Sequence, residues 1–237
     1  MKPRFVGRLG LADAITVANA ALGFLAAAMV LVDTGIAARL ILLGAIADGL
    51  DGVIARRRGG TPAGPYLDSL ADVATFGVAP AILVAAVTFE TWSIGADPGM
   101  VAVGLAAAAF FVAMAVTRLG LYTAYDTDKS ETEGAPTTLA ATILAASVLA
   151  GLTTPWYLVA LIAVLALAMV SQITYPDLHT QDALVMGVVQ ALAVVLPGEP
   201  GETFAFALLV LALAYFSISP FYYWGDGLEW GPLRSRS

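Results

Sequence analysis

The chain has 237 residues, of which 59% are hydrophobic and only 12% are charged. Soluble domains carry about twice that charged fraction, so the composition excludes an ordinary soluble protein and predicts one embedded in membrane lipid. The absence of cysteine excludes disulfides and thiolate metal sites. Acidic residues outnumber basic ones by 18 to 11, and we expect no nucleic-acid partner.

The acidic excess lies mostly between the apolar segments and has two interpretations. One is a solvated surface adapted to high salt, where screening weakens the repulsion between carboxylates. The other is ordinary loop acidity. The scarcity of lysine and the sequence pI near 4.5 favour the first interpretation.

Eight apolar stretches predict helices, and several of them reach the roughly 20 residues that cross a bilayer. The stretches are continuous and rich in Ala and Leu, without the alternation of barrel strands, so we expect an all-α integral membrane protein without strands. The seventh stretch is short and is also compatible with a re-entrant segment. The predicted helices cover residues 12–32, 36–56, 66–89, 98–125, 136–153, 156–173, 183–197 and 203–223.

Basic residues predict which side of the membrane each end faces. If the N-terminus is cytoplasmic, ten of the eleven basic residues fall on the cytoplasmic side, and only Arg39 falls near the outer face. An excess of Lys and Arg is typical of the cytoplasmic segments of membrane proteins. This distribution requires an even number of spans, so we expect both termini in the cytoplasm.

Four aspartates mark the most informative segment. Asp48 and Asp51 are spaced i, i+3 on the second helix, and Asp68 and Asp72 are spaced i, i+4 on the third. Each pair therefore lies on one helix face. A short turn joins the two helices, so the four carboxylates can converge at their cytoplasmic ends.

Four anions at membrane depth each cost several kcal/mol unless they are compensated. Divalent cations provide that compensation, since they prefer oxygen ligands. Two such ions held by shared carboxylates can clamp a diphosphate. The small residues Gly52, Ala55 and Gly64 would let a large ligand approach the backbone. The alternative interpretation is that these aspartates are helix caps and interfacial charges.

The four aspartates belong to a longer pattern. It reads Asp48-x-x-Asp51-Gly52-x-x-Ala55-Arg56, then a seven-residue spacer, then Gly64-x-x-x-Asp68-x-x-x-Asp72. This pattern resembles the signature of the CDP-alcohol phosphotransferase family. The resemblance implies a six-helix core, a homodimer and two divalent cations, Mg²⁺ or Mn²⁺. It also implies that Gly52, Ala55, Arg56 and Gly64 bind the CDP and phosphate groups. We then expect one membrane domain over residues 1–237, with a catalytic core at 10–175 and additional C-terminal helices at 176–237.

Three further stretches are similar to the phosphatidylserine synthase branch, closest to its archaeal members, the archaetidylserine synthases. They contain Phe76-Gly77 and Pro80, Arg118 with Tyr122, and Gly134 with Pro136. The sequence departs from that branch at Leu121, where a second arginine is expected. The resemblance implies CDP-archaeol or CDP-diacylglycerol as donor and L-serine as acceptor, with the active site open to the cytoplasm.

The roles expected from this resemblance can be assigned to residues. Asp48, Asp51, Asp68 and Asp72 would bind the cations, and Asp72, deeper in its helix, would also act as the base. Arg118 would bind the serine carboxylate, because its guanidinium matches a carboxylate. Asn19 would add a hydrogen bond. Two alternatives stay open, namely the same family with glycerol phosphate or inositol phosphate as acceptor, and a cation transporter.

Overall fold

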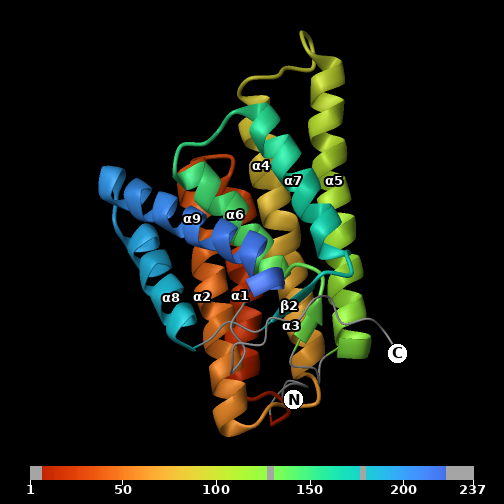
Figure 1. The fold of residues 1–237 in the computed structure, drawn as a ribbon, viewed down its shortest axis with the longest axis vertical. Helices are drawn as coiled ribbons and strands as arrows, with labels where there is room; N and C mark the ends of the chain where they lie inside the picture. Colours follow the sequence, from red (N-terminus) through yellow and green to blue (C-terminus); the bar gives the residue numbers. More distant parts are fainter. Residues whose placement is uncertain (1–6, 127–130, 177–179, 223–237) are drawn as a thin grey trace, which may run out of the picture.

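The computed structural model describes residues 7–126, 131–176 and 180–222 (Figure 1). Over these residues the chain forms a bundle of helices with two very short strands. The elements in chain order are α1 (Leu11–Met29), α2 (Thr34–Arg58), α3 (Gly64–Asp72), the π-helical segment η1 (Val73–Val78), α4 (Ala79–Phe89), α5 (Pro98–Leu121), the π-helical segment η2 (Tyr122–Asp126), β1 (Glu131–Glu133), α6 (Thr137–Leu149), α7 (Pro155–Met169), β2 (Thr174–Pro176), α8 (Thr180–Val195) and α9 (Gly198–Tyr222).

The helix boundaries follow from local chemistry. The Asp33 side chain accepts a hydrogen bond of 2.9 Å from the backbone N–H of Ile36 and caps the start of α2. Pro98 and Pro155 occupy the first positions of α5 and α7, where a missing N–H costs nothing. All eight predicted helices are present within a few residues of their expected ends.

Four helical segments are long and apolar enough to cross a membrane: Leu11–Met29, Gly64–Phe89, Pro98–Tyr125 and Gly198–Phe221. The second of these is continuous through α3, η1 and α4. Helices α6, α7 and α8 are apolar but shorter. The expected count of eight spans is not decided by these lengths, and the expected cytoplasmic termini lie outside the described residues.

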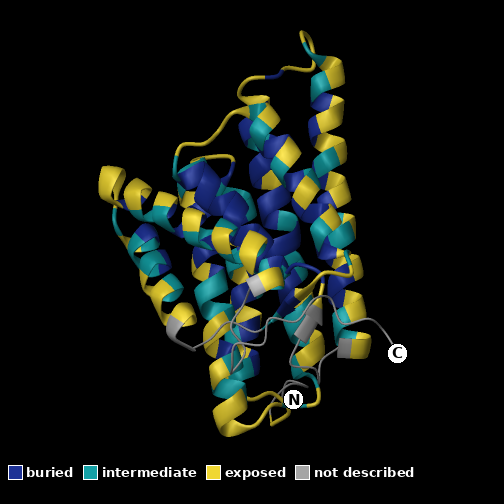
Figure 2. Cartoon of the chain, in the orientation of Figure 1, coloured by how far each residue is buried: buried dark blue, intermediate teal, exposed yellow. Residues whose placement is uncertain are grey.

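Helix α6 forms the centre of the bundle, where the buried residues gather in Figure 2. Every residue of α6 except Thr138 is buried. Large apolar side chains such as Leu31, Phe24 and Val195 are instead exposed on outward faces, where 88%, 70% and 75% of their surface is accessible. An apolar outer surface suits a protein surrounded by lipid rather than water.

Segment η1 packs tightly between α1 and α2. A Cβ at Gly23 or at Gly44 would collide with Thr75. The Thr75 hydroxyl donates a 2.8 Å hydrogen bond to the backbone carbonyl of Asn19. The two glycines therefore let the segment after Asp72 approach both helices, as small residues do in membrane bundles.

The two strands were not predicted, because three residues give no alternation to detect. Strand β1 pairs antiparallel with β2, with Glu133 opposite Thr174. Beyond the ladder, the N–H of Gly134 donates to the carbonyl of Ile173 at 2.8 Å. Gly134 has φ of +83°, and a Cβ there would collide with the carbonyl of Met169. Only glycine fits this position.

The last two helices pack against the rest of the bundle. The Gln190 side chain of α8 donates a 2.6 Å hydrogen bond to the backbone carbonyl of Leu42 in α2. The Tyr175 hydroxyl in β2 donates to the carbonyl of Phe216 in α9 at 3.3 Å. In Figure 1, α9 crosses in front of α6, which agrees with the packing of these two helices.

Candidate active site

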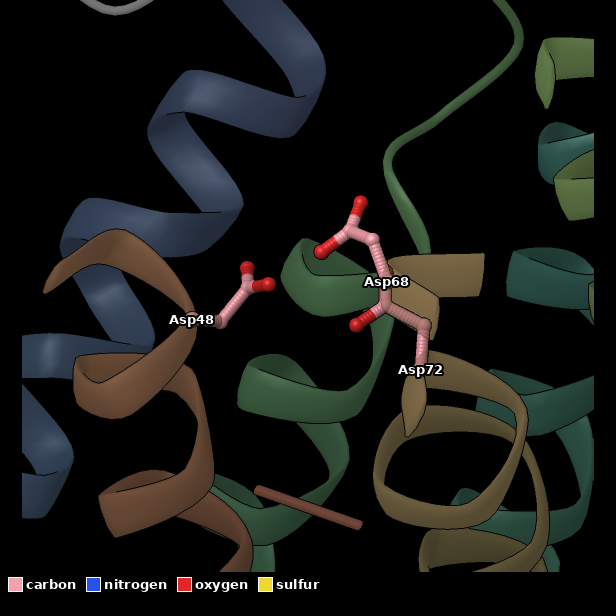
Figure 3. Close-up of side chains that lie close together, drawn as sticks. All are labelled: Asp48, Asp68 and Asp72. Atoms are coloured by element: carbon pink, nitrogen blue, oxygen red, sulfur yellow. The ribbon is translucent and has the colours of Figure 1, made fainter. Parts of the chain in front are cut away.

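Three of the four predicted aspartates form one cluster. Asp48 from α2 faces Asp68 and Asp72 from α3 (Figure 3). One carboxylate oxygen from each residue lies within 4.8 Å of the other two. The helical spacing predicted this convergence, because α2 and α3 run antiparallel after a short turn.

The cluster extends from the partly exposed Asp48 and Asp68 to the buried Asp72. Asp68 comes four residues after the start of α3, and Asp72 lies about 6 Å further along the helix axis, at 1.5 Å per residue. Asp72 is the more deeply placed, with only 7% of its surface exposed. It is followed at once by η1, and π-helical turns within longer helices often occur at functional sites.

Asp51 is not one of the three residues of this group, although it lies beside it on α2. Its carboxylate is buried, with 5% exposed, and accepts a 2.6 Å hydrogen bond from the hydroxyl of Thr16 in α1. The spacing i, i+3 turns Asp51 away from Asp48 by about 60°, since each residue advances by about 100°. Asp51 therefore links the cluster to α1 through Thr16.

The cluster's chemistry fits divalent cations. Two unit charges about 5 Å apart repel by roughly 3 kcal/mol at an effective dielectric constant of about 20. The Asp72 Oδ1 atom is buried and has no hydrogen-bond partner among the described residues. Asp48 accepts a 3.4 Å hydrogen bond from the hydroxyl of Thr138. Carboxylate oxygens in this arrangement are the ligands that Mg²⁺ and Mn²⁺ prefer.

Of the predicted diphosphate-binding residues, Gly52, Ala55 and Arg56 belong to the last turns of α2, and Gly64 is the first residue of α3 (Figure 1). A Cβ at Gly52 would lie 3.4 Å from a guanidinium nitrogen of Arg56, so the glycine makes room for that side chain. Arg56 is exposed, and Ala55 is partly buried. A Cβ at Gly64 would lie 3.4 Å from the Asp13 carboxylate.

Asp13 was not singled out from the sequence. Only 2% of its surface is exposed, and its Oδ2 atom accepts hydrogen bonds from the N–H of Gly10 at 2.7 Å and the hydroxyl of Thr61 at 2.8 Å. Thr61 belongs to the turn between α2 and α3. The i, i+3 spacing of Asp13 and Thr16 on an apolar helix was the signal that could have identified it.

Arg118 lies near the end of α5 and is 9% exposed. One of its guanidinium nitrogens donates to the Thr137 hydroxyl at 3.4 Å, and the guanidinium carbon lies 5.8 Å from the centre of the Tyr122 ring. Its charge is close enough to act on Asp72. Arg118 also lines a cavity of about 400 Å³.

Asn19, the other residue expected on the acceptor side, lies in the interior of the bundle. It is fully buried, with 0% exposed, and neither atom of its side-chain amide has a hydrogen-bond partner among the described residues. Its amide oxygen would lie 2.8 Å from a Cβ at Gly44. Asn19 is therefore packed between α1, α2 and η1, beside Thr75.

A helical bundle with an apolar surface and an internal carboxylate cluster defines a membrane protein with a candidate cation site. The family described as CDP-alcohol phosphatidyltransferase has a model that matches residues 9–195. The chain belongs to this family. The matched region includes the aspartate cluster, Arg118 and α8, and it stops before α9.

Two curated relatives are similar to parts of the chain. One is an archaetidylserine synthase from Methanothermobacter thermautotrophicus, 38% identical over 104 residues, which are 41% of this chain and 44% of the relative. The other is a CDP-diacylglycerol–serine O-phosphatidyltransferase from Mycobacterium leprae, 29% identical over 156 residues, which are 60% of this chain and 49% of the relative. The chain thus spans less than half the length of each relative that it matches.

Proposed function

We propose that this protein is a membrane enzyme that transfers a lipid-phosphoryl group from a CDP-lipid to the hydroxyl of L-serine. The products are a serine phospholipid and CMP. The observation that carries the proposal is the cluster of Asp48, Asp68 and Asp72 within one family-matched bundle. The names of both relatives support serine as the acceptor. CDP-archaeol and CDP-diacylglycerol are the candidate donors.

In this proposal the aspartates have two tasks, namely binding the cations and accepting the proton of the acceptor hydroxyl. Asp48, Asp51, Asp68 and Asp72 hold the divalent cations, and the Thr16 hydroxyl orients the Asp51 carboxylate. When bound, two cations would neutralise the donor's diphosphate and stabilise the departing CMP. Gly52, Ala55 and Gly64 leave room for the nucleotide beside the backbone, and Arg56 offers its guanidinium to the phosphates.

The acceptor reacts at the deep end of the cluster. Asp72 takes the proton from the serine hydroxyl, and the serine oxygen forms a bond to the lipid-linked phosphorus. The bond between the two phosphates breaks, and CMP leaves with the electron pair. Arg118 binds the serine carboxylate and so orients the hydroxyl. Asn19, whose buried amide has no hydrogen-bond partner among the described residues, adds a hydrogen bond on the acceptor side.

The proposal extends to the whole chain. Eight helices cross the membrane with both termini in the cytoplasm, and the active site opens to the cytoplasm. Residues 10–175 form the catalytic core of one domain over residues 1–237, residues 176–237 supply the additional C-terminal helices, and α8 contacts the core through the bond of Gln190 with Leu42. The homodimer expected from the family is part of the same proposal.

The test is CMP release by the purified protein supplied with CDP-archaeol or CDP-diacylglycerol and Mn²⁺ or Mg²⁺. We expect release that requires both L-serine and the metal, and that Asp72→Asn reduces by at least about a hundredfold. The CDP-lipid should still bind to that variant. Release only with glycerol 3-phosphate or inositol phosphate would change the acceptor, and no release with any acceptor would favour a cation transporter.

A further inference from the structure

A second polar site lies beside the carboxylate cluster. It is the cavity of about 400 Å³ lined by the end of α5, by η2, by β1 and by the residues that follow α7. This volume is within the range of about 300–1,000 Å³ that is typical of small-molecule sites. We call it the Arg118 cavity.

Two hydrogen-bonded contacts join the Arg118 cavity to the cluster. At the start of α6, Thr137 accepts from Arg118, while the next residue, Thr138, donates to Asp48. On the other side, the hydroxyls of Ser69 and Thr123 bond to each other. Ser69 follows Asp68, and Thr123 follows Tyr122 of the cavity lining. The cavity and the cluster are therefore connected through adjacent residues on two sides.

The described lining of this cavity contains one cation and one anion, Arg118 and Glu133. The two are held independently. Arg118 is fixed by Thr137 and the Tyr122 ring. Glu133 is fixed through its backbone, by the ladder to Thr174 and by the turn at Gly134. The Glu133 side chain is exposed and makes no hydrogen bond or ion pair with another described residue.

A cavity with separate positive and negative groups matches a zwitterion. We propose that Glu133 is a specificity-determining residue that binds the ammonium group of an amino-acid acceptor, while Arg118 binds its carboxylate. This inference rests on the proposed function and deepens it. With both ends held, the side-chain hydroxyl of the acceptor is directed toward Asp72.

Glu133 also acts against the wrong acceptors. Its carboxylate repels a phosphorylated alcohol or a dicarboxylate. When a hydroxy acid binds, the Glu133 carboxylate has no ammonium group to pair with. Discrimination of this kind commonly combines an attractive contact for one ligand with repulsion of others. The short β1–β2 ladder then has a function, because it holds Glu133 at the cavity wall.

The experiment measures the KM values for L-serine and for CDP-lipid in the wild type, Glu133→Gln and Glu133→Asp. Glyceric acid is the second ligand, because it keeps the carboxylate and primary hydroxyl of serine but replaces the ammonium with a hydroxyl. It is measured as an acceptor or, where it is not turned over, as a competitive inhibitor. Glu202→Gln, an exposed glutamate of α9, is the matched control.

We expect Glu133→Gln to raise the serine KM by about tenfold or more, which is the factor for losing about 1.4 kcal/mol of binding. The CDP-lipid KM should not change, the glycerate constant should fall because no unpaired carboxylate faces glycerate in the variant, and Glu133→Asp should keep part of the serine affinity. An unchanged serine KM would overturn the inference, and so would equal losses for serine and glycerate. Absence of serine-dependent CMP release in the wild type would instead overturn the proposed function.

Discussion

At the scale of single residues, Thr16 and Asp51 form the most informative contact outside the cluster. The 2.6 Å hydrogen bond joins a buried hydroxyl to a buried carboxylate. Hydrogen bonds to charged groups contribute about 1.5–3 kcal/mol, which is more than neutral ones. Thr16 thus sets the direction of the Asp51 carboxylate, and groups that orient metal ligands tune the affinity of the site.

Thr16→Val keeps the shape of the side chain and removes only the hydroxyl. We expect the Mn²⁺ concentration for half-maximal CMP release to rise by about tenfold, because Asp51 loses its orienting partner. Thr117→Val is the control, since the exposed Thr117 hydroxyl bonds only the carbonyl of Ala113 in its own helix at 2.8 Å. Equal metal requirements in the two variants would remove Thr16 from the site.

The sequence was sufficient to predict the pairing of Asp48 with Asp68 and Asp72, because helical spacing alone places them on facing sides of α2 and α3. It could not separate Asp51 from the group. That separation depends on the rotation of α2 against α1, which tertiary packing decides. Asn19 shows the same limit, because its burial beside Thr75 depends on the close approach permitted by Gly44, which no local pattern reveals.

At the scale of elements, α1 acts as a brace for the α2–α3 turn. The Asp13 carboxylate at its N-terminal end accepts from Gly10 and from Thr61 of the turn. One turn further along, Thr16 reaches Asp51. Helix α1 therefore contacts both sides of the turn whose position determines the separation of Asp48 from Asp68.

Removing this brace should affect the cation site as well as stability. For Asp13→Ala we expect a lower unfolding temperature in detergent. The Mn²⁺ concentration for half-maximal CMP release should rise by about tenfold. Thr61→Val should cause a smaller loss, because Asp13 keeps the Gly10 N–H. Asp13→Asn, which retains an acceptor oxygen, should recover most of both properties.

The double variant tests whether the two residues act together. If Asp13 and Thr61 act through their mutual hydrogen bond, combining Asp13→Ala with Thr61→Val should cost no more than Asp13→Ala alone. Additive losses would show that the two side chains contribute separately. Wild-type cation affinity in Asp13→Ala would contradict a positioning role, even if the variant were less stable.

Element boundaries were predictable where apolar stretches ended at Pro, Gly or charged residues, as at Pro98, Pro155 and Gly59. The β1–β2 ladder was not predictable, because its pairing joins segments more than 40 residues apart and each is only three residues long. Its position depends on the contact of Gly134 with the end of α7, which no local pattern reveals.

At the scale of the whole molecule, the two ends of the bundle differ in chemistry. The aspartate cluster, Arg118 and the arginines at the end of α2 lie toward one end. At the other end, Trp92 and Trp156 meet edge to face with ring centres 5.0 Å apart. Helix α5 has 24 residues and is about 36 Å long at 1.5 Å per residue, enough to separate these ends by a bilayer. The arginines at the cluster's end are the reason that we propose a cytoplasmic position for it, since Lys and Arg are in excess in cytoplasmic loops.

The natural absence of cysteine makes this orientation directly testable. Arg57→Cys places a thiol at the exposed end of α2, and Ser93→Cys places one in the exposed connection between α4 and α5. In intact cells, a membrane-impermeant maleimide should label Ser93→Cys, and it should label Arg57→Cys only after the membrane is opened. The unmodified chain is the control, because it has no thiol to label. Labelling of Arg57→Cys in intact cells would put the carboxylate cluster at the outer face, where cytoplasmic CDP-lipid and serine could not reach it.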